Sequence, residues 1–139
     1  MGKVEGMKSE WFFGDLLRDK GIKYVFENDW YDFLVKGSYK VEIKSCQITV
    51  KRGKKEHKGQ GKYRIGRFDF TDKENRERQI KENIQIGFII RHKEQFIMYG
   101  FVKANQLSGK RYLSIHQLRE LRPMSFEYWI LELYKKERT

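Results

Sequence analysis

The feature that most constrains the fold of this sequence is a three-residue turn between two apolar strand patterns. The turn is KGS at positions 36–38, after WYDFLV at 30–35 and before the segment 39–50, in which apolar and charged residues alternate. Alternation with a period of two is typical of a strand with one buried face, and a loop of three residues joins antiparallel strands in a hairpin. The expected pairings in this hairpin are Val35 with Tyr39, Phe33 with Val41, and Asp32 with Glu42.

The segments around the hairpin show helix and strand patterns in a definite order. A first helix is expected from Ser9, as its N-cap, to Lys20, followed by a strand at 22–27. The elements expected after the hairpin are a polar helix at 72–84 capped near Thr71 or Asp72, strands at 85–91 and 95–102, and helices capped by Ser114 and Ser125. This order predicts one α/β domain over residues 1–139, with a mixed central sheet flanked by helices and with extra C-terminal helices.

The cysteine count and the apolar runs bear on the compartment. Cys46 is the single cysteine, so it has no cysteine partner for an intramolecular disulfide or a zinc site. The N-terminal segment MGKVEGMKSE lacks the apolar region of a signal peptide, and no run reaches the roughly 18 apolar residues that cross a bilayer. We therefore expect a soluble protein in a reducing, cytoplasmic setting.

The charge of the chain favours a polyanionic partner. Thirty lysines and arginines against nineteen aspartates and glutamates give a net charge of +11. An excess of this size attracts nucleic acid through counterion release and long-range steering. The densest part, KRGKKEHKGQGKYR at 51–64, has three glycines and no apolar periodicity, so it is expected to be a cationic loop that contacts phosphates. The candidate nucleic-acid-binding residues are Lys51, Arg52, Lys54, Lys55, Lys58, Lys62, Arg64 and Arg67.

Three charged side chains of the hairpin are expected to converge. In the predicted register Asp32 faces Glu42, with their Cβ atoms about 4.5 to 5.5 Å apart, and like charges there are destabilising unless something neutralises them. A divalent cation with a preference for oxygen ligands, Mg2+ or Mn2+, would do so. Lys44 shares the strand face of Glu42 and would orient or deprotonate an attacking water, or neutralise a phosphate. The hairpin thus predicts a metal-dependent phosphodiesterase site.

These residues resemble the signature of the PD-(D/E)XK nuclease superfamily, in which an aspartate is followed at some distance by Glu-x-Lys, here Asp32 and then Glu42-Ile43-Lys44. The superfamily includes restriction endonucleases and archaeal Holliday junction resolvases. The resemblance implies a restriction-endonuclease-like αβββαβ core over roughly residues 9–103, with catalysis of DNA cleavage in the presence of Mg2+. The sequence departs from the family name at Tyr31, where that name has proline.

The same resemblance implies roles for three further residues. Glu10, at the start of the first helix, matches the helical glutamate that adds a metal contact in the resolvase branch. Ile43, between Glu42 and Lys44, belongs to the metal-binding set, and Gln47 matches a polar position often found after the motif. The candidate catalytic residues are Asp32, Glu42, Lys44, Glu10 and Gln47, and the candidate metal-binding residues are Asp32, Glu42, Glu10 and Ile43.

Other interpretations stay open at this point. Asp32, Glu42 and Lys44 would also suit a solvated strand face in which Lys40 and Lys44 balance the acids. A module of the same fold that binds DNA or RNA without cutting it would keep the cationic residues but not use the acidic pair. A basic protein of a ribonucleoprotein would bind structured RNA or another protein. The aromatic stripe of the last helix suits either core packing or a homodimer interface.

Overall fold

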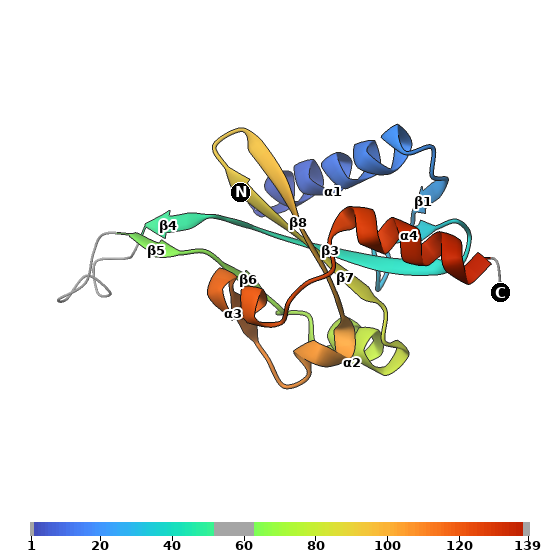
Figure 1. Cartoon of the computed structure of the whole chain (residues 1–139). Helices are drawn as coiled ribbons and strands as arrows, with labels where there is room; N and C mark the ends of the chain where they lie inside the picture. The colour runs from blue at the N-terminus through green and yellow to red at the C-terminus, as the bar shows by residue number, and fades with distance from the viewer. Residues whose placement is uncertain (1, 52–62, 138–139) are drawn as a thin grey trace.

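The computed structural model describes residues 2–51 and 63–137, and these form a mixed α/β structure around a central sheet (Figure 1). The strand order in the five-stranded sheet is β1-β2-β3-β7-β8. Its strands are β1 (Tyr24–Phe26), β2 (Phe33–Val35), β3 (Tyr39–Gln47), β7 (Gln85–His92) and β8 (Gln95–Lys103). The β3 and β7 strands at its centre run parallel, whereas the other neighbours run antiparallel, so the sheet is mixed, as expected.

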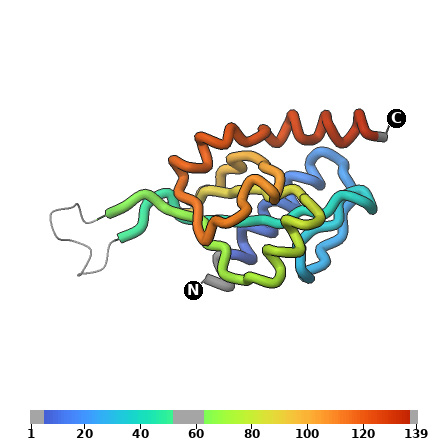
Figure 2. The backbone as a smooth tube through the Cα atoms, turned by 90° about the horizontal axis from the view of Figure 1, so that it is seen from below, coloured from blue at the N-terminus to red at the C-terminus, as the bar shows by residue number. Residues whose placement is uncertain are grey.

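Helices cover both faces of this sheet. Within the described residues these are the four α-helices α1 (Gly2–Asp19), α2 (Lys73–Glu82), α3 (Ile115–Glu120) and α4 (Phe126–Glu137), with the short 3-10 helix η2 (Ala104–Leu107). One core cluster joins Phe13 and Leu17 of α1 to Trp129 and Leu133 of α4 on one side of the sheet. A second cluster lies on the side of α2 and α3 and includes Leu118. Figure 2 shows α4 running along the outside of the molecule.

The predicted hairpin is confirmed. Phe33 pairs with Val41 and Val35 with Tyr39, in the expected register. Lys36 and Gly37 have φ values of 55° and 77°, the left-handed conformation that a tight turn requires. The two strands therefore hold a fixed register up to the acidic pair.

Several predicted boundaries need correction. The helix does not begin at Ser9, because α1 starts at Gly2 and Ser9 is fully buried inside it rather than exposed at its end. The strands expected at 22–27 and 30–35 are shorter, because residues 27–32 turn back through backbone hydrogen bonds such as Glu27 N–H to Asp32 O (2.8 Å). The caps of the later helices are confirmed: the side chains of Asp72, Ser114 and Ser125 accept from Asn75, Gln117 and Tyr128 N–H respectively.

Two small sheets were not predicted. The long strand expected over 39–50 ends at Gln47, and the chain continues as β4 (Thr49–Lys51), which pairs with β5 (Tyr63–Ile65) and projects from the body (Figures 1 and 2). A second pair joins β6 (Arg67–Asp69) to β9 (Tyr112–Ser114). The cationic loop predicted over 51–64 thus begins and ends in strands, and residues 52–62 lie outside the described part of the chain.

Among the described residues, no helix has both the length and the apolar character that crossing a membrane would take.

Candidate active site

The hairpin brings Asp32 and Glu42 together. Asp32 directly precedes β2, and its backbone N–H donates to the carbonyl oxygen of Val41 (3.0 Å), the strand partner of Phe33, so the backbone of Asp32 stays against β3. One carboxylate oxygen of Asp32 accepts from the backbone N–H of Ile43 (2.8 Å), and a side-chain hydrogen bond links Asp32 to Glu42. The pairing of the two acids therefore follows the prediction.

These acids are not a solvated strand face. Asp32 is only 9% exposed and the Glu42 side chain 13%. Lys40, the other cation of that alternative, lies 3.1 Å from Glu82 and not beside the two acids. Because both carboxyl groups are buried, protein partners and not water must compensate for their lost hydration. The two acids therefore form an enclosed site, and the solvated alternative is wrong.

A cavity of about 200 Å³ surrounds the two acids and Lys44. Lys44 Nζ lies 3.5 Å from Glu42 Oε2 and 5.8 Å from the centre of the Phe70 ring. Its side chain is three-quarters buried, so the ammonium group is held between a carboxylate and an aromatic face. The remaining wall comes from the turn before β2 and from the start of α2, and its residues are Asp29, Asp72, Asn75, Arg76 and Gln79.

Gln79 supports the acidic pair from α2. Its Nε2 donates to Trp30 O (2.7 Å), and its side chain also hydrogen-bonds Glu42. Gln79 is buried, in a helix whose sequence, KENRERQIKE, is otherwise polar apart from Ile80. Its only signal in the sequence is its place beside that single apolar residue, which is too weak to predict a buried side chain.

Burial changes the ionisation of the acids. It raises the pKa of Glu42 to about 8, and the nearby charge of Asp32 acts in the same direction. The pKa of Asp32 is also raised by burial, although the hydrogen bonds from Glu42 and Ile43 and the charge of Lys44 favour its ionised form. At neutral pH the pair therefore carries a proton, which Glu42 donates to Asp32. A cation bound between them would take the place of that proton.

Glu10 lies close enough for the charge of Asp32 to affect its pKa, but it lines a different cavity. The pKa of Glu10 is raised to about 7, first by burial and then by the charge of Asp32. Its neighbours in a cavity of about 260 Å³ include Trp11, Tyr24 and Phe26. In the described part of the chain, no three His, Cys, Asp or Glu side chains are grouped closely enough to hold a metal ion, so Glu10 is not brought into one cluster with Asp32 and Glu42.

The donor atoms of the pair fit a hard divalent cation. Mg2+ typically takes one or two protein carboxylates and keeps waters or phosphate oxygens for its other positions. Asp32 and Glu42 provide such a pair, and because burial raises the pKa of both, two negative charges are unfavourable there without compensation. Ile43 contributes no side-chain donor, since its side chain is buried in the core on the α1 side.

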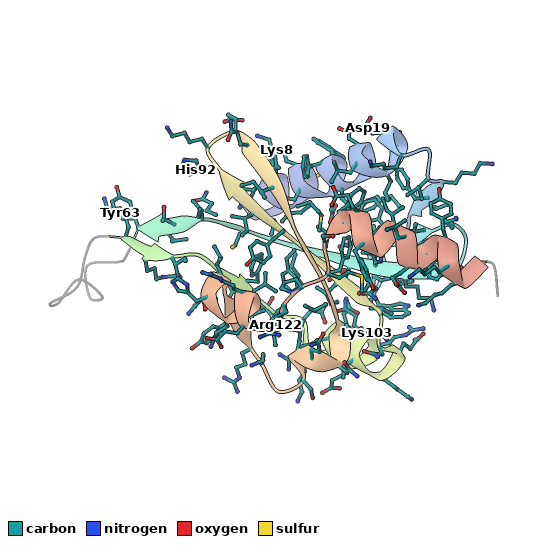
Figure 3. All side chains as sticks on the ribbon, viewed as in Figure 1. Lys8, Asp19, Tyr63, His92, Lys103 and Arg122 are labelled. Carbon is teal, nitrogen blue, oxygen red and sulfur yellow. The ribbon has the colours of Figure 1, made fainter. Side chains whose placement is uncertain are left out.

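The other predicted residues lie elsewhere. Gln47 and Lys51 line a cavity of about 500 Å³ with Tyr63, Arg91 and His92, at the end of β3. Figure 3 shows Lys8, Tyr63 and His92 at this end of the molecule. Gln47 is therefore not among the residues lining the acidic cavity, contrary to its predicted catalytic place.

Two arginines of the predicted nucleic-acid-binding set fall within the described residues, and they lie in different strands. Arg64 belongs to β5, and its guanidinium donates to Ile65 O (3.4 Å), whereas Arg67 belongs to β6 and lines a separate cleft. The members that fall outside the described residues are Arg52, Lys54, Lys55, Lys58 and Lys62.

The raised pKa of Glu42 predicts how stability depends on pH. Between its ordinary value of 4.5 and about 8, folded Glu42 keeps a proton that the unfolded chain releases. Stability is thus highest below this window and falls as pH rises through it. Glu42→Gln should flatten this slope and raise the free energy of unfolding at pH 8 by on the order of 2 kcal/mol. Urea unfolding from about pH 5 to pH 8 measures this effect.

Glu82→Gln is the matched control for that measurement. Glu82 is exposed, and its pKa is lowered by its hydrogen bond from Lys40, so removing its charge should leave the slope between pH 5 and pH 8 unchanged. A Glu42→Gln variant with the same slope as the wild type would contradict the raised pKa of Glu42.

Comparison with known proteins adds no relative. No protein-family model, no curated protein and no solved structure matched this chain. The case for a function therefore depends on the residues of the site.

Proposed function

We propose that this chain is a metal-dependent nuclease that hydrolyses DNA phosphodiester bonds. The observation that carries the proposal is the enclosed pair of Asp32 and Glu42, with Lys44 3.5 Å from Glu42 in the same cavity. Two carboxylates and an ammonium group at one spot are the set that binds a divalent cation together with an anionic phosphate. Asp32 and Glu42 would hold Mg2+ or Mn2+.

The residues of the chain divide the chemistry between them. Hydrolysis forms a bond from a water oxygen to phosphorus and breaks the bond from phosphorus to one ester oxygen, which takes up a proton. When bound, the ion would polarise the phosphate and favour ionisation of water. Lys44 would neutralise the phosphate charge or orient the water, while the Ile43 N–H and Gln79 fix the two carboxyl groups. Burial of the pair excludes bulk solvent.

The arrangement of elements supports the resemblance stated for the sequence. When only the strands of the five-stranded sheet are counted, and β4 to β6 of the small sheets are left aside, the order α1, β1 to β3, α2, β7 follows the helix, three strands, helix and strand of a PD-(D/E)XK core. Glu42 of the acidic pair lies on β3, and Asp32 directly precedes β2. We propose a restriction-endonuclease-like core on this basis. The net charge of +11 supports DNA as the partner, with RNA as the other polyanion and a homodimer as an open arrangement.

The alternative is a module of this fold that binds DNA or RNA without cutting it. The observation in its favour is that the side chains of Asp32 and Glu42 hydrogen-bond each other and Lys44 Nζ lies 3.5 Å from Glu42 Oε2, so the three groups have partners without an ion. This alternative predicts salt-sensitive binding that EDTA does not alter and no strand scission.

The rate at which the Lys44→Ala variant cleaves DNA should distinguish a nuclease from a module that binds DNA without cutting it. We expect wild-type protein to cut labelled DNA with Mg2+ and not with EDTA, and Lys44→Ala to be slower by about a hundredfold, since a positioned cation or general base contributes roughly that much. Gels of duplex and branched substrates measure this rate. Lys40→Ala is the control, because Lys40 lies on the same strand but pairs with Glu82 and not with the acidic pair. The Lys40→Ala variant should therefore cut DNA at the wild-type rate.

Either result is informative. Loss of cutting in Lys44→Ala, with activity kept in Lys40→Ala, would support the nuclease. Binding without scission on every substrate and with either metal would leave the non-catalytic module.

A further inference from the structure

A second cleft adjoins the cavity of the acidic pair. It has a volume of about 600 Å³, and Phe70 and Arg76 line both spaces. By comparison, the cavity with Gln47 and Arg91 at the end of β3 shares no lining residue with the acidic cavity. A ligand in the adjoining cleft would therefore be separated from the cavity of Asp32 and Glu42 by the side chains of Phe70 and Arg76.

The adjoining cleft is built by the small β6–β9 sheet and the start of α2. Asp69 pairs with Tyr112 and Arg67 with Ser114 across this sheet, which brings the side chains of both strands to one wall. Lys73 is the first residue of α2. The wall next to the acidic cavity is Arg76, whose guanidinium donates to Phe70 O (3.2 Å) and to Lys110 O (3.0 Å).

The charge of this cleft is positive. Its cationic side chains are Arg67, Lys73, Arg76 and Arg111, against the single carboxylate of Asp69, which lies 3.4 Å from Arg67. Four cations and one acid, placed on strands and on a helix of the fold, suit the closely spaced phosphates of a nucleic-acid backbone.

Tyr112 adds an aromatic surface to the same cleft. It is 49% exposed, and the Arg67 guanidinium lies 4.6 Å from the centre of its ring. An exposed ring beside arginines is the combination on which unpaired bases stack while cations follow the phosphates. A base inside a duplex has both of its faces covered by its neighbours, so this ring favours a single strand.

We propose that this cleft binds single-stranded DNA, with a base stacked on Tyr112 and phosphates on Arg67 and Arg111, and leads the strand past Arg76 to the acidic pair. The proposal rests on the proposed nuclease function and names its substrate class, a DNA with a single-stranded end or flap. It goes beyond the predicted contacts of the sequence, which included Arg67 but not Arg111, Lys73 or Tyr112.

The test is the binding of labelled DNA in EDTA, measured by fluorescence anisotropy with a single strand and a blunt duplex of the same sequence. Tyr112→Ala should weaken single-strand binding about tenfold, the loss of one stacked base, and change duplex binding less than about twofold. Tyr112→Phe keeps the ring and should bind as the wild type does. Tyr128→Ala, an equally exposed tyrosine on α4, should change neither affinity.

Arg111→Glu tests the phosphate contacts separately. It should weaken single-strand binding and reduce the salt dependence of the affinity by about one phosphate contact. Thermal unfolding of each variant checks that the fold is kept, and if Tyr112→Ala does not fold, the Tyr112→Leu variant is measured in its place.

The proposal is overturned if Tyr112→Ala binds a single strand as tightly as the wild type, or if it loses single-strand and duplex affinity equally. Because binding is measured in EDTA, this result does not depend on cleavage. If the wild type cuts no DNA but Tyr112→Ala still loses single-strand binding, the proposed nuclease function is wrong and the proposal that the cleft binds single-stranded DNA stands. If the wild type cuts DNA and the Tyr112→Ala substitution has no effect on binding, only the proposal that the cleft binds single-stranded DNA is wrong.

Discussion

Glu42→Gln should abolish cleavage of DNA while leaving a folded protein that binds it. Glutamine keeps the size of Glu42 and its hydrogen bonds with Asp32 and Gln79, but it removes one of the two negative charges that would hold the cation. Loss of several kcal/mol of charge stabilisation in the transition state corresponds to a rate at least about a thousandfold lower. Single-turnover cleavage at saturating protein measures this rate without a contribution from binding.

The stability of the same variant provides the internal control. Because the Glu42 charge is unfavourable in the buried pair, Glu42→Gln should unfold at higher urea concentration than the wild type at pH 8. A variant that is more stable, binds DNA with unchanged affinity and does not cut would assign Glu42 to the chemistry. If the Glu42→Gln variant cleaves DNA at the wild-type rate, the proposed site is wrong, whatever the stability of the variant.

The acidic pair could be predicted because its position depends on local rules. The turn at 36–38 sets the register of β2 and β3, and the register places Asp32 beside Glu42. Alternation along β3 then puts Lys44 on the same face. Each step uses residues close in sequence, so it does not require knowledge of how distant segments pack.

Contacts between distant segments could not be predicted in this way. Gln79 reaches the pair only because α2 packs on the sheet. Gln47, in contrast, belongs to β3 but lies at an odd spacing from Glu42 and Lys44, so the alternation along the strand already places it on the opposite face. Ser9 looked like a helix cap because it is a common capping residue before an apolar stripe, but the helix continues and buries it. Tertiary packing decided the positions of Gln79 and Ser9.

The charge of the chain indicated nucleic acid but not where it would bind. The densest run of lysines lies at 51–64, whereas the cations that adjoin the acidic pair come from β6, α2 and the segment before β9. Arg111 and Lys73 are far apart in sequence and meet only in the fold. A charge count therefore favours a class of ligand, whereas the path that we propose for it depends on the sheet topology.

Gly66→Ala should be among the most destabilising single substitutions in the chain. Gly66 lies between β5 and β6, where its N–H donates to Ile48 O (2.9 Å) and its carbonyl accepts from Ile115 N–H (3.2 Å). A Cβ atom there would lie 1.7 Å from the backbone oxygen of Gln47, far inside van der Waals contact. Backbone must move to relieve this overlap, and we expect a loss of about 3 kcal/mol or more in the free energy of unfolding.

Gly6→Ala is the control for this measurement, since a Cβ atom at Gly6 in α1 meets nothing within 4 Å. That substitution should leave stability unchanged or raise it by up to about 1 kcal/mol, because alanine favours a helix over glycine. Urea unfolding of both variants gives the two values. Equal stabilities would show that the backbone from β5 to β6 can move away from Gln47 at little cost in free energy. A large loss for Gly66→Ala alone would show that the close approach to Gln47 holds the segment in place, and with it Arg67 in the adjoining cleft and Phe70 beside the acidic pair.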